Sequence, residues 1–333
     1  MAKSKTLRVA VAGPNWGENH LQGAAESEHG EPCALWGRSD KPEYRALADR
    51  VGVPFYTDYS LMLSESKPDV VTVATQEPGH APFTMEALAA GCDVYCEKVI
   101  SDSHDAAREM VRAAAAAKRE LNIGYNYRYS VSCQWMRRQI EAGRIGEPLF
   151  GQLSAFTWCV HHMTDYVNSV LGTPTRVMAR LELDPLADLP HKSIYEPGHL
   201  FETFAYAAYT RKVYTVEYES GALLQAGATD YADISEPAAR LMIQGTAGRV
   251  ELDDLTGKVT LWEAAREATV YTPSQILDPI GLRMNCVEAV KDFLRALAAG
   301  EGAPIPGQDG VNMILLEEAI MRASKSGGWE DVA

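Results

Sequence analysis

The first third of the chain alternates short apolar runs with longer segments in which apolar residues recur at helical spacing. The short runs are apolar throughout, as expected for parallel strands that helices cover on both faces. The expected strands are residues 7–12, 32–36, 69–74, 93–96 and 121–124, and the expected helices are residues 18–27, 42–51, 80–90 and 103–117. We therefore predict an α/β fold with a doubly wound parallel sheet, whose ligands bind at the carboxyl ends of the strands.

The pattern changes after a linker-like stretch at residues 143–148. Several later strand-like segments alternate apolar with polar residues, which is typical of an antiparallel sheet with one solvated face. These segments are residues 149–158, 175–183, 212–219, 223–229 and 240–244. We expect an α+β domain with a large, mainly antiparallel open sheet. An open sheet face favours pairing of subunits into a homodimer or homotetramer.

A length of 333 residues exceeds the usual size of a single hydrophobic core, so we expect two domains. The change of pattern places the first over residues 1–123 and the second over residues 124–333. Within the second, residues 184–199 are rich in proline and charge and are expected to form a long loop, a candidate lid.

A formal net charge of −14 disfavours nucleic acid and anionic membrane surfaces as partners. No run of about twenty apolar residues occurs, and no apolar secretory segment precedes the first strand, which predicts a cytoplasmic protein. The six cysteines are scattered without a CxxC pair, so we expect them to be reduced. Local cations and backbone N–H groups must therefore hold any anionic ligand.

A glycine-punctuated turn follows the first expected strand, with Gly13 at the strand end and Gly17 near a helix start. Glycine lets the backbone approach a pyrophosphate, and the N–H groups at the start of the helix attract the anion. The turn is one residue shorter than the usual GxGxxG motif, with Asn15 about where the middle glycine is expected and Trp16 beside it. The alternative is an ordinary turn without a ligand.

Further motifs occur in a fixed order along the chain. They are Glu97-Lys98 at a strand end, residues 124–128, residues 162–165, Leu171-Gly172, residues 245–248 and the closing residues 316–327. Their order and spacing resemble the glucose-fructose oxidoreductase/inositol dehydrogenase/rhizopine catabolism (Gfo/Idh/MocA) family over nearly the whole chain. The resemblance implies an N-terminal Rossmann domain that holds a nicotinamide cofactor and a C-terminal domain that binds the substrate and builds oligomers.

The resemblance also implies that Lys98 lies near the reacting oxygen and that His162 belongs to the acid/base pair. Hydride transfer from an alcohol requires removal of a proton and stabilisation of negative charge on oxygen, which imidazole and ammonium groups supply. Asp165 lies one helical turn after His162 and is expected to orient the imidazole. The alternatives are that Lys98 is a solvated cation paired with Glu97, and that His162 caps a helix. His161 is a weaker candidate than His162.

Three features depart from the family pattern. Trp158 stands where the family often has an aspartate, four residues before His162. The stretch before His162 is shorter than in sugar-oxidising members, and Val99 replaces the proline that usually follows the lysine. These changes predict an altered acid/base system and argue against turnover of an ordinary sugar.

The end of the second expected strand bears on the choice of cofactor. Arg38 and Ser39 offer a cation and a hydroxyl group, and no carboxylate follows that strand before Asp40. This pair suits a 2′-phosphate, so we favour NADP over NAD. The alternatives are that Arg38 is an exposed turn residue and that Asp40 reaches a ribose from a displaced loop.

The remaining candidates follow other expected strands or lie in the candidate lid. The full set of expected cofactor contacts is Gly13, Asn15, Trp16, Gly17, Arg38, Ser39, Thr75, Gln76, His80, Glu97, Lys98 and Asn126, and the expected substrate contacts are Tyr127, Arg128, Trp158 and His161. We expect no metal site: His191, Glu196 and His199 have a spacing that could hold a metal, but a solvated loop is favoured.

The sequence thus predicts an NAD(P)-dependent oxidoreductase that moves a hydride between nicotinamide and a hydroxyl or carbonyl carbon. The expected substrate is a small polyol, cyclitol, sugar or biosynthetic intermediate. One alternative is a redox-neutral epimerase or lyase with a tightly bound dinucleotide. Another is a non-catalytic NADP-sensing regulatory protein, which the shortened turn favours and which Lys98 and His162 argue against.

Overall fold

The computed structural model describes residues 6–157, 159–182, 211–229, 239–253, 256–264, 266–273 and 282–332. The chain divides into two compact units. The first consists of Met1–Asn126 and Arg283–Asn312, and the second of Tyr127–Leu282 and Met313–Ala333. The division made from the sequence assigned residues 283–312 to the second domain, whereas in the structure they belong to the first unit. The candidate lid at residues 184–199 lies outside the described residues.

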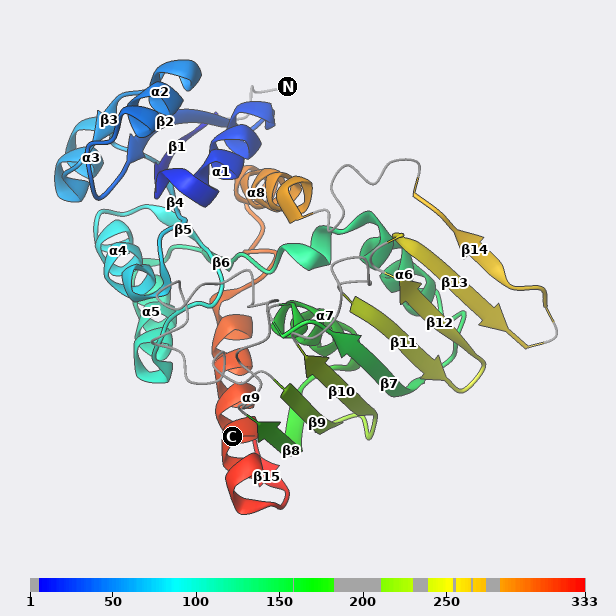
Figure 1. Cartoon of the computed structure of the whole chain (residues 1–333). Coiled ribbons are helices and arrows are strands. Elements are labelled where there is room, and N and C mark those ends of the chain that lie inside the picture. Colours follow the sequence, from blue (N-terminus) through cyan, green and yellow to red (C-terminus); the bar gives the residue numbers. More distant parts are fainter. Residues whose placement is uncertain are drawn as a thin grey trace. The chain divides into compact units, whose positions relative to one another are not determined.

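The first unit is built on a six-stranded sheet of order β3-β2-β1-β4-β5-β6, in which every neighbouring pair is parallel (Figure 1). Its strands are β1 (Leu7–Ala12), β2 (Gly30–Trp36), β3 (Phe55–Tyr56), β4 (Val70–Val73), β5 (Asp93–Cys96) and β6 (Leu121–Ile123). All four residues of β4 are buried, as expected for a strand covered on both faces. The predicted doubly wound parallel sheet is confirmed.

The helices of the first unit follow its strands in the βαβ manner. They are α1 (Pro14–Glu26), α2 (Pro42–Val51), α3 (Tyr59–Ser66), α4 (Glu77–Ala89) and α5 (His104–Ala117). A further helix, α8 (Leu282–Ala299), comes from far along the chain and packs against α1. The contact is close, because a Cβ atom at Gly23 would lie 2.9 Å from the carbonyl oxygen of Val287.

The second unit contains a nine-stranded sheet of order β14-β13-β12-β11-β7-β10-β9-β8-β15. Its strands are β7 (Pro148–Ala155), β8 (Pro174–Glu182), β9 (Arg211–Tyr218), β10 (Leu223–Thr229), β11 (Ala239–Gly245), β12 (Gly248–Asp253), β13 (Lys258–Glu263), β14 (Thr269–Tyr271) and β15 (Glu330–Asp331). The β7–β10 pair is parallel, and the other neighbouring pairs are antiparallel. The predicted mainly antiparallel sheet is confirmed.

Helices α6 (Val131–Glu141) and α7 (Val160–Leu171) pack on one face of this sheet (Figure 1). Two tyrosines of β9 bond to α7: the Tyr214 hydroxyl lies 2.6 Å from the Thr164 hydroxyl, and the Tyr218 hydroxyl donates to Asn168 Oδ1 at 2.7 Å. The remaining helices are η1 (Asn126–Tyr129), a short 3-10 helix, and α9 (Gly307–Ser326). Across the described segments, every helix is too short or too polar to traverse a lipid bilayer.

The opposite face of the nine-stranded sheet carries the outward residues of the alternating strands. Met178 on β8, Val213 on β9 and Leu223 on β10 are exposed hydrophobic residues. Val213 pairs with Gly227 of β10 and with Arg180 of β8. The alternation of buried and exposed positions in β9 is the one expected for a sheet with one covered and one open face.

Candidate functional site

The turn between β1 and α1 has the form expected of a phosphate-binding site. Gly13 has a φ of +104°, which favours glycine, and a Cβ there would lie 2.4 Å from the carbonyl oxygen of Ala74. α1 begins at Pro14, and no side chain among the described residues caps its N-terminus. Gly17 lets α1 approach β1, since a Cβ at Gly17 would lie 2.6 Å from Val11 Cγ1. The first N–H groups of α1 therefore fit an anion such as a pyrophosphate.

The turn after β2 carries the candidates for cofactor choice. Arg38 and Ser39 are exposed, and so is Asp40. Both oxygens of Asp40 accept hydrogen bonds from Arg45, at 2.5 Å from Nε and 2.6 Å from Nη2. This hydrogen bonding lowers the pKa of Asp40. The nearest carboxylate after β2 is therefore already bound to an arginine.

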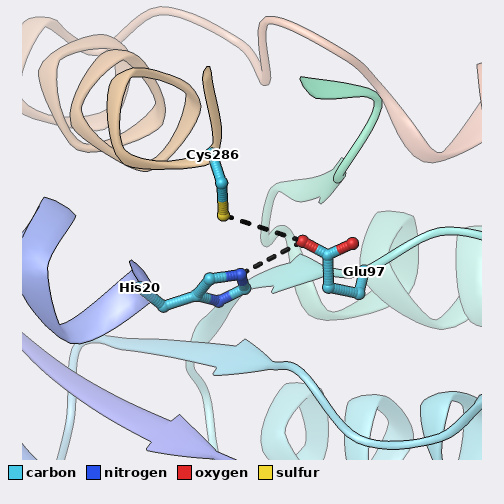
Figure 2. Close-up of side chains that lie close together, drawn as sticks. All are labelled: His20, Glu97 and Cys286. Atoms are coloured by element: carbon cyan, nitrogen blue, oxygen red, sulfur yellow. Dashed lines mark hydrogen bonds and ion pairs between the residues drawn. The ribbon is translucent and has the colours of Figure 1, made fainter. Parts of the chain in front are cut away.

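Glu97 directly follows β5, and its carboxylate joins three segments of the first unit (Figure 2). Trp16 Nε1 donates to Glu97 Oε1 at 3.0 Å, and His20 Nε2 lies 3.1 Å from the same oxygen. Cys286 Sγ of α8 lies 3.9 Å from it, and Oε2 accepts the backbone N–H of Lys98 at 3.2 Å. Burial opposes ionisation of Glu97, but His20 and Lys98 outweigh it, so its pKa is lowered.

Lys98 is half-buried, and the segment after it is tied to the loop after β4. His80 of α4 makes this connection: its Nδ1 lies 2.6 Å from the carbonyl oxygen of Val99, and its Nε2 lies 3.1 Å from that of Thr75. Burial lowers the pKa of His80. The Thr75 hydroxyl donates to the carbonyl of Gln76, which is exposed. Thr75, His80 and Lys98 therefore belong to one connected edge of the sheet.

The turn after β6 completes this edge. A Cβ at Gly124 would lie 2.9 Å from the carboxyl carbon of Glu97, so the carboxylate occupies the space that a larger residue would need. Asn126 is buried, and its backbone N–H donates to the carbonyl of Gly124 at 2.9 Å. Asn15 is exposed at the start of α1. The cofactor candidates Gly13, Trp16, Glu97, Lys98 and Asn126 thus all follow the carboxyl ends of β1, β5 and β6.

His20, Glu97 and Cys286 also form a group of metal-ligand types, with ligand atoms within 4.8 Å of one another (Figure 2). All three are buried, and burial raises the pKa of the Cys286 thiol well above its usual value. A metal binds the thiolate, so this shift works against metal binding. The hydrogen bonds to Glu97 account for the arrangement without a metal.

The sequence interpretation missed one ionisable residue at this edge. Glu77 is the first residue of α4 and is only 5% exposed. Burial raises the pKa of Glu77, while its own backbone N–H and the charge of Lys98 oppose the increase. An acidic residue soon after a buried strand was the available signal, but its burial could not be read from the sequence.

In the second unit, the start of α7 gathers the other candidates. His161 and His162 are 8% and 4% exposed, their rings stack with centroids 4.3 Å apart, and the Tyr127 ring lies 5.0 Å from that of His162. Arg128 donates to both oxygens of Asp165, at 2.8 Å from Nε and 2.6 Å from Nη2. The structure therefore brings these five residues into one region. Orientation of His162 by Asp165 stays a prediction.

Some candidates cannot be placed. Trp158, His191, Glu196 and His199 lie outside the described residues. The expected substrate contact at Trp158 and the weighed metal spacing in the candidate lid therefore have no structural account.

A protein-family model matches the N-terminal part of the chain. Residues 7–125 match the sequence model GFO_IDH_MocA, described as an oxidoreductase family with an NAD-binding Rossmann fold. The matched residues lie within the first unit, and they are similar to the NAD-binding Rossmann domain of that oxidoreductase family. Over residues 7–125 the chain is therefore similar to the Gfo/Idh/MocA family, and the resemblance predicted from the sequence is supported for this part of the chain.

Curated relatives align with part of the chain. Over 104 residues it is 36% identical to D-glucoside 3-dehydrogenase from Escherichia coli (strain K12), an alignment that covers 31% of this chain and 30% of the relative. It is 31% identical over 104 residues to an inositol 2-dehydrogenase from Rubrobacter xylanophilus, with the same coverage. The chain thus spans less than a third of the length of these two relatives in sequence alignment.

Solved structures match the fold over almost the whole chain. Levoglucosan dehydrogenase in complex with NADH matches with a TM-score of 0.83 and 19% identity, over 99% of this chain and 100% of that one. An oxidoreductase from Agrobacterium radiobacter, in complex with NAD+, L-tartaric acid and magnesium, matches with a TM-score of 0.83 and 18% identity, over 98% and 99%. At these identities the likeness shows a shared fold.

Proposed function

We propose that the protein is an NAD(P)-dependent oxidoreductase that transfers a hydride between nicotinamide and a hydroxyl or carbonyl carbon. The proposed substrate is a small polyol, cyclitol, sugar or biosynthetic intermediate. One observation carries the proposal: Glu97 accepts hydrogen bonds both from Trp16 of the glycine turn and from the backbone of Lys98. One carboxylate thereby links the candidate phosphate-binding turn to the backbone of the residue that carries the ammonium group, at the same sheet edge. The dehydrogenase names of the curated relatives support the reaction class.

In this proposal, a bound nicotinamide would supply or accept the hydride. Lys98 Nζ donates a hydrogen bond to the reacting oxygen and stabilises the negative charge that develops on it. His162 accepts the proton of the alcohol at a ring nitrogen, or returns it in the reverse direction. Arg128 and Asp165 neutralise each other through their two hydrogen bonds and present a fixed polar surface near the histidine pair.

The test is the substitution Lys98→Ala. We expect cofactor affinity to stay nearly unchanged and turnover to fall by about 10²- to 10⁴-fold, because the ammonium acts on the reacting oxygen. Lys291→Ala is the matched control, since the Lys291 ammonium bonds Glu288 on α8 at 2.6 Å. Dinucleotide titration and steady-state absorbance at the nicotinamide band measure the two quantities.

Full turnover by Lys98→Ala would remove the role given to Lys98. A dinucleotide that leaves the purified protein only on denaturation, with no net absorbance change during turnover, would contradict net oxidation or reduction and favour the redox-neutral alternative. Dinucleotide binding without turnover of any polyol, cyclitol or sugar, together with a specific protein partner, would favour the regulatory alternative.

For the cofactor, we propose a preference for NADP over NAD. The turn after β2 offers the Arg38 guanidinium and the Ser39 hydroxyl, both exposed. The hydrogen bonds from Arg45 occupy both oxygens of Asp40, the carboxylate that would otherwise accept the 2′-hydroxyl of NAD. A cation without a competing carboxylate fits a 2′-phosphate.

We also propose that the open face of the nine-stranded sheet pairs two copies of the chain in a homodimer or homotetramer. Five outward residues on β7, β9, β10 and β11 form an uncharged group, which charged residues such as Arg240 on β11 border: Gln152, Ser154, Val213, Gln225 and Met242. Depletion of charge at the centre of a patch is typical of protein interfaces.

A further inference from the structure

The function proposed so far gives no part to the buried carboxylate at the start of α4. Glu77 is 5% exposed, and its Oε2 atom has no hydrogen-bond partner within the described parts of the chain. The charge of Lys98 stabilises the ionised form of Glu77, whereas the charges of Asp102 and Glu97 destabilise it. A buried carboxylate oxygen without a donor is costly, so its presence requires an explanation.

Glu77 lies at the edge where a dinucleotide binds in this type of sheet. β4 pairs with β1, and the carbonyl oxygen of Ala74 just after β4 would be 2.4 Å from a Cβ at Gly13. The loop that leads to Glu77 is held by His80, which bonds the carbonyl of Thr75. Doubly wound sheets bind dinucleotides at the carboxyl ends of these strands.

The two sides of β1 receive different parts of a dinucleotide. In a sheet of this type, the end of β2, followed by Arg38 and Ser39, would receive the adenosine ribose, and the start of α1 would receive the pyrophosphate. A bound nicotinamide and its own ribose would then extend over β4 and β5, the strands that are followed by Glu77 and Lys98. That ribose carries two neighbouring hydroxyl groups, which are donors that an ionised carboxylate accepts.

We propose that Glu77 accepts hydrogen bonds from the hydroxyl groups of the ribose on the nicotinamide side of the cofactor. This inference rests on the proposed function, because it needs a bound dinucleotide. It adds a named contact for the half of the cofactor that carries the reacting ring. The contact satisfies the open oxygen of Glu77 and holds the nicotinamide in place beside Lys98.

The test compares two ligands that differ by one ribose. ADP ends at the second phosphate, whereas ADP-ribose carries the nicotinamide-side ribose without the nicotinamide. Isothermal titration of the whole protein with each ligand, before and after Glu77→Gln, isolates the contact to that ribose. If the protein prefers NADP, the 2′-phosphorylated forms of both ligands are used. We expect ADP-ribose to bind about tenfold more weakly to Glu77→Gln, with ADP almost unchanged.

Glu86→Gln is the matched control, because Glu86 lies on the same helix near its other end and bonds Ser60. It is expected to change neither affinity. Thermal unfolding without ligand supplies a second measurement. Glu77→Gln is expected to keep or raise the unfolding temperature, because it removes a buried charge without a donor at Oε2. A residue retained only for folding would show the opposite change.

Equal ADP-ribose affinity in the wild type and Glu77→Gln would overturn the inference. So would an equal loss of ADP and ADP-ribose affinity, or a lowered unfolding temperature with unchanged ligand preference. These results leave the proposed oxidoreductase function intact, because both ligands still bind the wild type. A wild type that binds neither ligand nor any nicotinamide dinucleotide would remove the proposed function and this inference together.

Discussion

Among single residues, Glu97 connects more of the candidate site than its place in a two-residue motif suggests. Its carboxylate accepts from Trp16 in the glycine turn and from the backbone of Lys98, and it lies against His20 and Cys286. The partners His20 and Cys286 are 77 and 189 residues away along the chain. Glu97 is therefore more than a surface partner for Lys98, which was the alternative interpretation from the sequence.

A single-residue substitution at Arg38 tests the proposed contact with the 2′-phosphate. Arg38→Ala should weaken NADPH binding by about 10- to 100-fold, the effect of losing hydrogen bonds to a charged group, and leave NADH binding almost unchanged. Dissociation constants for both cofactors, from fluorescence titration, measure the difference. Arg50→Ala is the control, because Arg50 lies on α2 and bonds Glu18 instead. Equal effects of Arg38→Ala on the two cofactors would contradict a 2′-phosphate contact.

Among elements, the β1–α1 turn departs from the usual glycine spacing and yet keeps its geometry. α1 begins at Pro14, immediately after Gly13, four residues before the helix start expected from the apolar pattern. Proline is favoured in the first turn of a helix, where its missing N–H has no partner to lose. The turn loses one residue but still directs the first N–H groups of α1 toward the edge of the sheet.

Gly13→Ala tests the turn. The added Cβ would lie 2.4 Å from the Ala74 carbonyl oxygen at a φ of +104°, so the backbone must move and cofactor binding should be lost. Gly52→Ala is the control for strain alone, because Gly52 has a φ of +80° and nothing within 4 Å of its Cβ position.

The control is expected to cost about 1 kcal/mol of unfolding free energy and to leave dinucleotide affinity intact. Denaturant unfolding and dinucleotide titration measure both effects. Normal affinity in Gly13→Ala would show that the dinucleotide does not bind at this turn.

At the scale of the whole molecule, the open face of the nine-stranded sheet governs the prediction about assembly. Val213 is 54% exposed on β9, within the uncharged group of that face. Val213→Lys places a charge there, in register with Arg180 on the neighbouring strand, and should convert the proposed oligomer to monomers, because an unpaired charge buried in an interface is costly.

Light scattering after size exclusion measures the change in mass. Leu61→Lys is the control, because Leu61 is a 46% exposed hydrophobic residue of α3 in the first unit. An unchanged mass for Val213→Lys would place the subunit contact elsewhere, and a monomeric wild type would contradict the proposed assembly.

The sequence predicted most of the fold because the relevant signal is local. The buried strands β4 and β5 are continuous apolar runs, and β9 alternates between buried and exposed positions, so each run indicates the surroundings of its own strand. The glycine turn was likewise visible, since only glycine tolerates the backbone of Gly13.

Only the tertiary structure shows which side chains bond to each other and which are buried. The sequence could not show that Arg45 binds Asp40, that Arg128 binds Asp165, or that Glu77 is buried. The sequence pattern also assigned α8 to the second domain, whereas the residues after Leu282 belong to the first unit. Hydrophobic periodicity and backbone sterics depend on residues that are close together in the sequence, so they can be recognised from the sequence alone. Hydrogen bonds and burial depend on which distant segments meet, and only the folded chain brings those segments together.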